Sequence, residues 1–495
     1  MADWIHINPA DNVAVALTDL AAGRIAEGTT LLQDIPAGHK FTLADLHEGD
    51  EVIKYGFPIG RVTKDAPKGS LIDHSCIKTA LSGVLEYSYN PQLKDIPSDG
   101  KARSFKGFRR ADGNIGIRNQ IWVIPTVGCV NGAAEEIARR LREEKAGNMG
   151  SVDAIVAFPH NYGCSQLGDD HENTRTVLAD MAHHPNAGGV LFVSLGCENN
   201  QLSSFRSLIA DCDPLRVRAI ECQKIEGDEV EEGLHQAREI FEICSRDERS
   251  EASVSELKIG LKCGGSDGLS GITANPLLGR FSDWLVSKGG TTVLTEVPEM
   301  FGAETILMNR CQDRETFEKT VSLINDFKEY FIRSGQPVYE NPSPGNKAGG
   351  ISTLEEKSLG CTQKCGASTV RDVLRYGQRL STKGLNLLSS PGNDLLVAST
   401  ALAASGCQLV LFTTGRGTPF GSFVPTMKIS TNSSLARRKP LWIDFNAGVI
   451  AEDEAMDSVA ERFIDAVLEV ADGKAVRSEE SGIREIAIFK TGVTL

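Results

Sequence analysis

Three of the 12 cysteines follow apolar runs at places where a binding site is expected. Cys129, Cys164 and Cys197 each come a few residues after a predicted strand. Ligands bind outside the carboxyl ends of parallel strands, and thiolates suit iron, zinc or iron–sulfur clusters. We therefore expect these three thiols to share a metal site, with Cys263, which ends a strand of the next domain, as a weaker candidate. The alternative is that each cysteine only packs as a small apolar residue.

Three further residues are candidates for acid–base chemistry. His160 precedes Cys164 by four residues, Glu296 follows a predicted strand, and Asp267 lies in a glycine-rich loop. Each could act as a general acid or base. The alternative for each is a structural hydrogen-bonding role.

Glycine-rich loops form the third group, at residues 263–276, 341–350 and 413–421. Glycine lets backbone N–H groups approach an anion. We expect a pocket for a polyhydroxylated anion, with substrate-binding side chains at Ser266, Asn275, Lys347 and Arg416. None of the loops is a Walker A motif or a G-x-G-x-x-G fingerprint, so nucleotide binding is not expected. Simple tight turns are the alternative.

The elements that must position these residues alternate between strand and helix. Apolar runs at Ile121–Thr126, Ala154–Phe158 and Val190–Leu195 predict buried strands, and helices are expected at about 131–145 and 170–183. This alternation predicts a parallel sheet with helices on both faces.

A second set of such strands follows a polar boundary near residues 246–255. They are expected at Leu257–Lys262, Thr291–Thr295, Leu385–Leu388 and Leu409–Thr413.

The chain before residue 92 has a different pattern. Short apolar runs at Val13–Leu17, Glu51–Tyr55 and Ile59–Val62 alternate with Gly and Pro turns, which is typical of a β-rich domain. We therefore expect a multidomain α/β protein. Its parts are a β-rich domain (1–92), a linker (93–104), a central α/β domain (105–250) and a C-terminal α/β domain (255–495), with largely parallel sheets in the last two.

Charge and composition restrict the partners. The net charge of −14 argues against nucleic acid and anionic membranes, which attract basic patches. No apolar run approaches the roughly 20 residues that span a bilayer, and the first residues lack a secretory pattern. We expect a cytoplasmic protein with reduced thiols, a small-molecule substrate and a homo-oligomeric state.

Several of these strings resemble the altronate/galactarate dehydratase family. The most specific are residues 263–276, 341–350, 413–419 and 162–171, and the likeness extends to the closing residues 489–495. Residues 298–304 and 162–171 resemble the altronate branch. The stretch around His74 carries one histidine where that branch usually has His-x-His-Asn, and residues 69–73 look closer to the galactarate branch.

The resemblance implies a SAF-like (β-clip) N-terminal domain and a sugar-acid dehydratase. The reaction would convert D-altronate to 2-dehydro-3-deoxy-D-gluconate and water, by metal-assisted removal of the C2 proton and the C3 hydroxyl. It implies iron, as Fe²⁺ or an iron–sulfur cluster, with manganese as an alternative, and it adds His74 to the substrate-binding residues. Galactarate or another hexonate or hexarate is the alternative substrate. The alternatives of another class are a non-catalytic sugar-acid binding protein and a zinc hydrolase.

Overall fold

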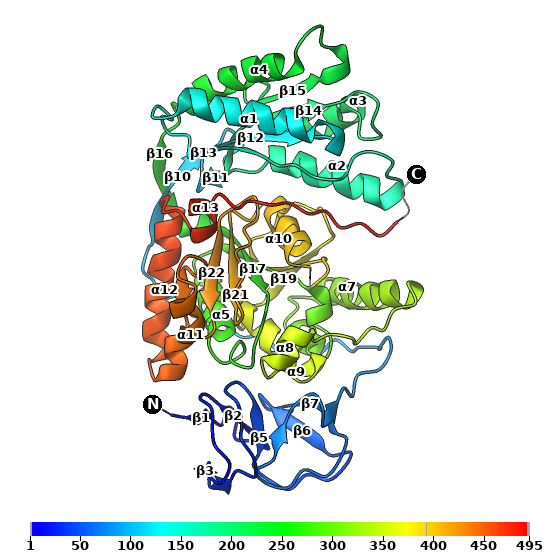
Figure 1. The fold of residues 1–495 in the computed structure, drawn as a ribbon, viewed down its shortest axis with the longest axis vertical. Coiled ribbons are helices and arrows are strands. Elements are labelled where there is room, and N and C mark those ends of the chain that lie inside the picture. The colour runs from blue at the N-terminus through cyan, green and yellow to red at the C-terminus, as the bar shows by residue number, and fades with distance from the viewer. Residues whose placement is uncertain (1, 393, 493–495) are drawn as a thin grey trace.

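Short antiparallel strands build the N-terminal part of the protein, at the bottom of Figure 1. The computed structural model describes residues 2–392 and 394–492, so residues 493–495 of the predicted C-terminal string lie outside it. A four-stranded sheet, β1-β2-β5-β8, lies beside a three-stranded sheet, β6-β7-β9, and the β3-β4 pair. The strands are β1 (Trp4–Ile5), β2 (Val13–Ala16), β3 (Ile25–Ala26), β4 (Thr29–Thr30), β5 (Lys40–Thr42), β6 (Glu51–Lys54), β7 (Phe57–Val62), β8 (Leu71–Ile72) and β9 (Ile77–Lys78).

The middle domain, at the top of Figure 1, contains a parallel sheet in the order β13-β12-β14-β15. Alternate residues of β12 face opposite sides: Ile121 and Val123 pack with α1 and α4, whereas Trp122 and Ile124 pack with α2. Helices therefore cover both faces. The elements are β12 (Gln120–Pro125), α1 (Asn131–Lys145), β13 (Ala154–Ala157), α2 (Gly168–Ala182), β14 (Ala187–Ser194), α3 (Leu202–Phe205), β15 (Val217–Glu221) and α4 (Glu229–Cys244).

A small antiparallel sheet connects this domain to the next. The boundary stretch near residue 250 forms β16 (Arg249–Ser253), which pairs with β10 (Ser104–Arg109), and β10 also pairs with β11 (Ile115–Gly116). This sheet therefore fixes the middle domain at the two places where the chain enters and leaves it.

The C-terminal domain contains seven parallel strands in the order β19-β20-β18-β17-β21-β22-β23. The predicted fold class is confirmed, since both larger sheets are parallel and follow a β-rich domain. The strands are β17 (Lys258–Cys263), β18 (Thr291–Leu294), β19 (Val370–Leu374), β20 (Gly384–Leu388), β21 (Leu409–Thr414), β22 (Thr426–Ser430) and β23 (Phe445–Asn446). The helices are α5 (Ala274–Ser287), α6 (Glu304–Met308), α7 (Arg314–Arg333), α8 (Pro344–Ala348), α9 (Leu354–Thr362), α10 (Leu395–Ala404), α11 (Ser433–Arg438), α12 (Met456–Ala471) and α13 (Arg477–Glu480).

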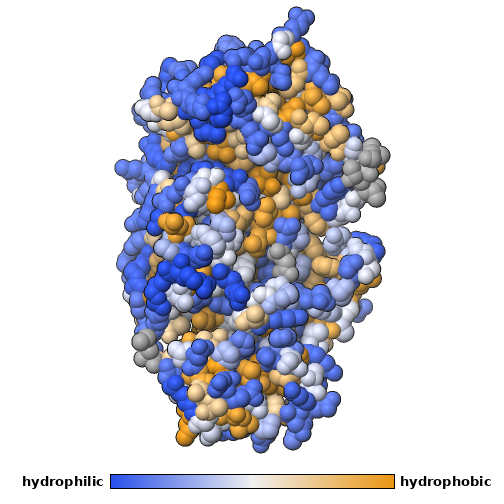
Figure 2. All heavy atoms as spheres, viewed as in Figure 1, coloured by the Kyte–Doolittle hydropathy of each residue, from blue (hydrophilic) through white to orange (hydrophobic). Residues whose placement is uncertain are grey.

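The polarity of the surface and the lengths of the helices are those expected of a chain without long apolar runs. Figure 2 shows a face with many hydrophilic side chains, and strongly hydrophilic ones gather over the C-terminal domain. Among residues 2–392 and 394–492, no helix is long and apolar enough to cross a membrane.

A buried carboxylate fastens the N-terminal domain to the C-terminal domain. Glu356 of α9 lies 2.9 Å from Lys40 Nζ of β5 and 2.7 Å from Lys54 Nζ of β6. All three side chains are at most 2% exposed. Burial alone would raise the pKa of Glu356, but the two ammonium groups outweigh burial and lower it to about 2.

We predict that Glu356→Gln lowers the free energy of unfolding by about 3–5 kcal/mol, because both lysines would stay buried without a counter-charge. Chemical denaturation measures the change. The control is Glu51→Gln, which breaks the half-exposed Arg61–Glu51 pair and should cost roughly 0–1 kcal/mol. Equal losses in the two variants would contradict the prediction.

The same pair predicts a pH effect. The pKa of Glu356 is about 2 in the folded protein, below its usual 4.5. Its stabilisation is therefore complete above about pH 4.5 and is lost as the pH falls towards 2. In Glu356→Gln, this part of the acid dependence should be missing when unfolding is measured across that range.

Candidate functional site

The strand order of the C-terminal sheet places a crevice between β17 and β21. The chain leaves β17 towards β18 on one side and returns to β21 on the other. In open parallel sheets, ligands bind at this reversal, outside the carboxyl ends of the strands. A cleft of about 700 Å³ lies here, and it is lined by residues of both the C-terminal and the N-terminal domains, among them Gly38, Asp267, Arg416, Asn432, Arg437 and Arg438.

Arg416 stands at the end of β21 and is exposed in this cleft. Its backbone N–H and that of Gly415 donate to Gly265 O at 3.0 and 3.1 Å, which ties its loop to the loop after β17. Arg437 and Arg438 of α11 line the same cleft. Three guanidinium groups give the cleft a local positive charge within an acidic protein, which suits a carboxylate ligand.

Asp267 lies between this cleft and a much smaller inner cavity, and it lines both. Its carboxylate accepts hydrogen bonds from Thr431 Oγ1 at 2.9 Å, Asn432 Nδ2 at 3.1 Å and Ser270 Oγ at 3.1 Å. Burial raises the pKa of Asp267, since these bonds only partly offset the loss of water. Both oxygens of Asp267 accept hydrogen bonds, so a role in proton transfer would require one of these bonds to break.

The glycine-rich loop after β17 is pressed against the N-terminal domain. A Cβ on Gly268 would lie 1.9 Å from Gly38 O, one on Gly271 would lie 2.4 Å from Tyr55 Oη, and one on Gly350 would lie 2.3 Å from Gly38 O. These glycines therefore permit the domains to dock, in addition to any role in anion binding. The sequence alone did not indicate this requirement.

Behind the inner cavity lies a buried cluster of charged side chains. Glu296, in the left-handed region at φ 76°, lies 2.5 Å from both Lys262 Nζ and Lys364 Nζ. Burial raises the pKa of Glu296, and Glu299 nearby adds to this effect. Both oxygens of Glu296 are engaged, so its predicted role as a base stays a prediction.

Two thiols complete this cluster. Cys263 Sγ and Cys361 Sγ lie 3.5 Å apart, and Glu299 Oε2 lies 3.3 and 3.2 Å from them. Their ligand atoms all lie within 4.8 Å of one another, the spacing of a metal site. The hydrogen bond with Cys263 raises the pKa of the Cys361 thiol, and burial adds to the rise.

Two lysines contact this Cys/Glu/Cys group directly. Lys364 Nζ lies 3.0 Å from Cys263 Sγ, and Lys357 Nζ lies 3.0 Å from Glu299. With Lys262, three ammonium groups face the two carboxylates of Glu296 and Glu299. A dication that displaced the protons of the two thiols would leave the net charge of the cluster unchanged, so Cys263, Glu299 and Cys361 form a possible buried metal site.

The other predicted substrate-binding residues differ in whether they line the cleft or the inner cavity. Ser266 and Asn275 are buried and line the inner cavity. The side chain of Asn275 joins β21 to α9, because it accepts from Thr413 Oγ1 at 2.7 Å and donates to Gly360 O at 2.9 Å. Lys347 and His74 are not among the residues that line the cleft or the inner cavity. Their binding roles stay predictions.

His160 is buried in the middle domain with both ring nitrogens engaged. Nε2 donates to Pro125 O at 2.7 Å, and Nδ1 accepts from Tyr162 N at 3.1 Å. Burial lowers the pKa of His160 to about 4. These two bonds hold the loop that follows β13 against the end of β12. A role of His160 in catalysis, as predicted, would require one of them to break.

The predicted thiol trio lies at the carboxyl edge of the middle sheet. Cys129, Cys164 and Cys197 are all exposed and follow β12, β13 and β14. These strands are parallel neighbours, as expected. The trio is not among the groups whose ligand atoms all lie within 4.8 Å of one another in the described residues.

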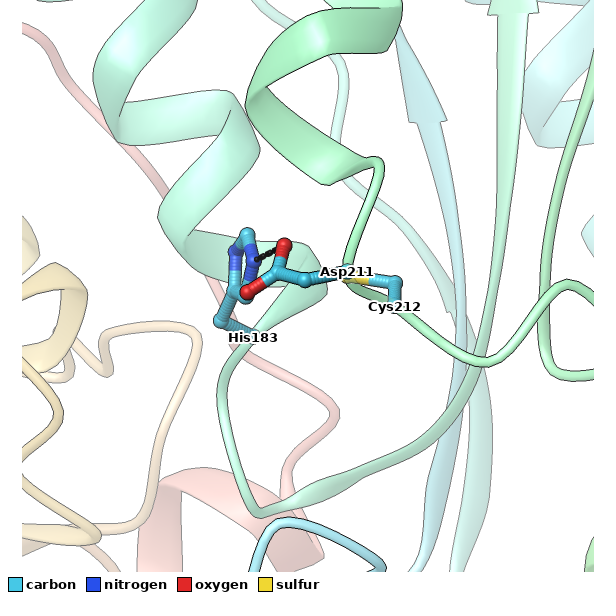
Figure 3. A group of neighbouring side chains, drawn as sticks. All are labelled: His183, Asp211 and Cys212. Atoms are coloured by element: carbon cyan, nitrogen blue, oxygen red, sulfur yellow. Dashed lines mark hydrogen bonds and ion pairs between the residues drawn. The ribbon is translucent and has the colours of Figure 1, made fainter.

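A second group with close ligand atoms consists of His183, Asp211 and Cys212, drawn in Figure 3. His183 Nε2 lies 2.8 Å from Asp211 Oδ1, and Nδ1 lies 2.9 Å from Ala179 O. The bond from His183 lowers the pKa of Asp211, and burial raises the pKa of Cys212 to about 11. The group consists of a hydrogen-bonded His–Asp pair beside a protonated thiol.

Sequence reasoning missed the residues that neutralise the buried cluster, namely Glu299, Lys357, Cys361 and Lys364. One signal was available, since Lys262 is a charged residue near the carboxyl end of a strand whose preceding residues, Ile259 to Leu261, carry no polar side chain. The others come from segments far along the chain, and only the packing of α9 on the sheet edge brings them together.

Three family models match successive parts of the chain. They are the altronate/galactarate dehydratase SAF domain (residues 2–80), the D-galactarate dehydratase/altronate hydrolase second domain (107–245) and the D-galactarate/altronate dehydratase C-terminal domain (254–494). Altronate dehydratase from Escherichia coli K12 is 55% identical over 99% of this chain and 100% of its own length. This chain belongs to the altronate/galactarate dehydratase family.

Other members of the altronate/galactarate dehydratase family match over the same length. Altronate dehydratase from Bacillus subtilis 168 is 56% identical and covers both chains completely. Galactarate dehydratase (L-threo-forming) from E. coli K12 is 32% identical over 99% of this chain and 97% of its own. The resemblance expected from the sequence is confirmed.

We predict that Arg416→Lys lowers kcat/KM by roughly tenfold to a hundredfold. Lysine keeps the charge but loses the planar fork that binds a carboxylate through two hydrogen bonds. Losing such a contact costs roughly 1.5–3 kcal/mol. Steady-state kinetics on the family substrates measure the change, and Arg462→Lys, in an exposed ion pair of α12, is the control. Wild-type kinetics in Arg416→Lys would remove Arg416 from the site.

Proposed function

We propose that this protein is a hydro-lyase that converts D-altronate to 2-dehydro-3-deoxy-D-gluconate and water. The observation that carries this proposal is the identity of 55% and 56%, over essentially full length, to two altronate dehydratases, against 32% to a galactarate dehydratase. Galactarate is the alternative substrate.

The cleft between β17 and β21 supports this function. A hexonate carries one carboxylate and several hydroxyl groups, and the cleft offers guanidinium groups beside polar side chains. Arg416 would bind the carboxylate, and Asn432 and Ser433 offer hydrogen-bonding groups to the hydroxyls. The volume of about 700 Å³ leaves room for the substrate and water.

Removal of the C2 proton requires a base close to the bound carboxylate. Asp267 is suited to this role because it lies at the cleft wall and burial raises its pKa. The negative charge that develops on the substrate carboxylate would be stabilised by Arg416. Departure of the C3 hydroxyl requires a proton, which Asp267 could return once it has received the C2 proton.

We also propose iron as the cofactor, as Fe²⁺ or an iron–sulfur cluster, with manganese as the alternative. Cys129, Cys164 and Cys197 are the residues that would hold it, and the buried group of Cys263, Glu299 and Cys361 is the alternative site. Bound iron would supply a Lewis acid for the substrate oxygens. A cytoplasmic location and a homo-oligomeric state stay predictions.

Purified protein, loaded with iron without oxygen, should convert D-altronate to the 2-keto-3-deoxy acid, measured by product analysis. The matched panel holds D-altronate, galactarate and other hexonates and hexarates at equal concentration. Faster turnover of galactarate with altronate inert would move the protein to the other branch. Binding without turnover would favour a sugar-acid binding protein, and full activity with zinc after iron chelation would favour a zinc hydrolase.

Asp267→Asn tests the proposed base. The amide keeps the size of the side chain but cannot accept the C2 proton, so kcat should fall by roughly 10²–10⁴-fold. Exchange of the C2 hydrogen with solvent deuterium, followed by NMR, should be lost in parallel. An Asp267→Asn variant that still exchanges C2 hydrogen at the wild-type rate would assign the base elsewhere.

A further inference from the structure

The carboxyl edge of the middle sheet carries cysteines after consecutive neighbouring strands. In the order β13-β12-β14-β15, the strands are followed by Cys164, Cys129, Cys197 and Cys222. Adjacent strands lie about 4.8 Å apart. The first three cysteines are exposed, whereas Cys222 packs against the core between α1 and α4. Burial raises the pKa of Cys222 to about 11. The edge therefore offers three accessible thiols and one that is turned inwards.

The loops that carry the three exposed thiols are bonded to one another. Gly128 N donates to Tyr162 O at 3.0 Å, and Asn200 N donates to Gly163 O at 3.1 Å. Asn200 Nδ2 donates to Thr126 O at 3.0 Å. A Cβ on Gly163, at φ 94°, would lie 2.1 Å from Thr126 O, so only glycine allows this contact. The three loops form one bonded unit.

Buried polar side chains hold this unit in place. Glu198, 2% exposed, accepts from Ser194 Oγ at 2.6 Å, Thr126 Oγ1 at 2.8 Å and Gly196 N at 2.6 Å. Asn131 Nδ2 donates to His160 O at 2.8 Å, which ties the first loop to the second. These bonds fix the geometry of the loops that carry the thiols.

The Cys197 thiol has a side-chain hydrogen-bonding partner. Gln223 Nε2 donates to Cys197 Sγ at 3.4 Å, the kind of hydrogen bond that tunes an iron–sulfur centre.

A single metal ion and an iron–sulfur cluster require different distances between their thiolate ligands. Three sulfurs on one tetrahedral ion lie about 3.8 Å apart, given metal–sulfur bonds of about 2.3 Å. This trio is not among the described groups with all ligand atoms within 4.8 Å. In a cluster, each thiolate binds a different iron atom, so the sulfurs lie farther apart than on one ion. The arrangement therefore suits a cluster better than a single ion.

We infer that Cys129, Cys164 and Cys197 hold a [4Fe–4S] cluster in which one iron atom has no protein thiolate. Such an iron is free to bind an oxygen of a hydroxy acid. This inference deepens the proposed iron dependence, but cluster binding can be measured without any substrate. If a cluster forms and altronate is not dehydrated, the proposed function fails and the cluster site stands.

The experiment is anaerobic reconstitution of the full chain with Fe²⁺ and sulfide. Wild-type protein should bind about four iron atoms and four sulfides per chain and show the broad visible absorption of sulfide-to-iron charge transfer. Cys129→Ser, Cys164→Ser and Cys197→Ser should each lose most of both. The control is Cys212→Ser, a half-buried thiol that precedes β15 and so lies at the amino edge of the same sheet, and it should keep the full cluster. Without iron and sulfide, the melting temperature measured by circular dichroism should be the same in all four variants as in the wild type, because none of these thiols is in the core.

Oxidation tests the open iron. Ferricyanide takes one electron from the [4Fe–4S]²⁺ cluster, which should then release its unligated iron as Fe²⁺ and leave [3Fe–4S]⁺, seen by electron paramagnetic resonance. A cluster that resists ferricyanide and is lost in Cys222→Ser would mean four thiolates and overturn the inference. Iron bound without labile sulfide, or clusters retained in the three Cys→Ser variants, would also overturn it.

Discussion

Buried charge on helix α9 is the constraint on which the arrangement of the domains depends. All nine residues of this helix are buried, although four consecutive ones, Glu355 to Ser358, are polar. Glu356 points to the N-terminal domain and meets Lys40 and Lys54, whereas Lys357 and Cys361 point to the sheet edge and meet Glu299. Removing one partner of such a buried pair typically costs about 3–5 kcal/mol. Helix α9 can therefore stay buried only if both neighbours supply their charges.

This constraint explains why the glycine-rich loops lie where they do. Once Lys40 and Lys54 reach Glu356, the turn at Gly38 is brought against Gly268 and Gly350 with no room for a side chain. The same contact places Asp267 between the outer cleft and the inner cavity. The N-terminal domain is thus part of the cleft wall, and its docking shapes the site.

The middle domain is joined to the C-terminal domain by a different force. Trp122 and Phe192 of its sheet share a hydrophobic core with Leu388 and Leu402 of the C-terminal domain. Its other face has a core of its own with α1 and α4. This apolar interface adds to the β10–β16 pairing and to the buried Arg118–Glu479 ion pair, and the exposed thiols are not part of that core. The two sulfur groups differ for this reason: the Cys263 group is closed in by lysines, whereas the trio is open to an incoming cluster.

The sequence by itself determined the strands, the parallel sheets and the edge on which three cysteines gather. These features depend on local apolar patterning and on the rule that ligands bind at the carboxyl ends of strands, so β12, β13 and β14 were expected within a few residues. It also determined the family, because the glycine-rich strings are specific. Tertiary structure alone decided that Glu299, Lys357, Cys361 and Lys364 meet Cys263 and Glu296, and that His160 has both nitrogens engaged. Charge neutralisation in a protein interior depends on which distant segments come into contact, and no local pattern of residues encodes that.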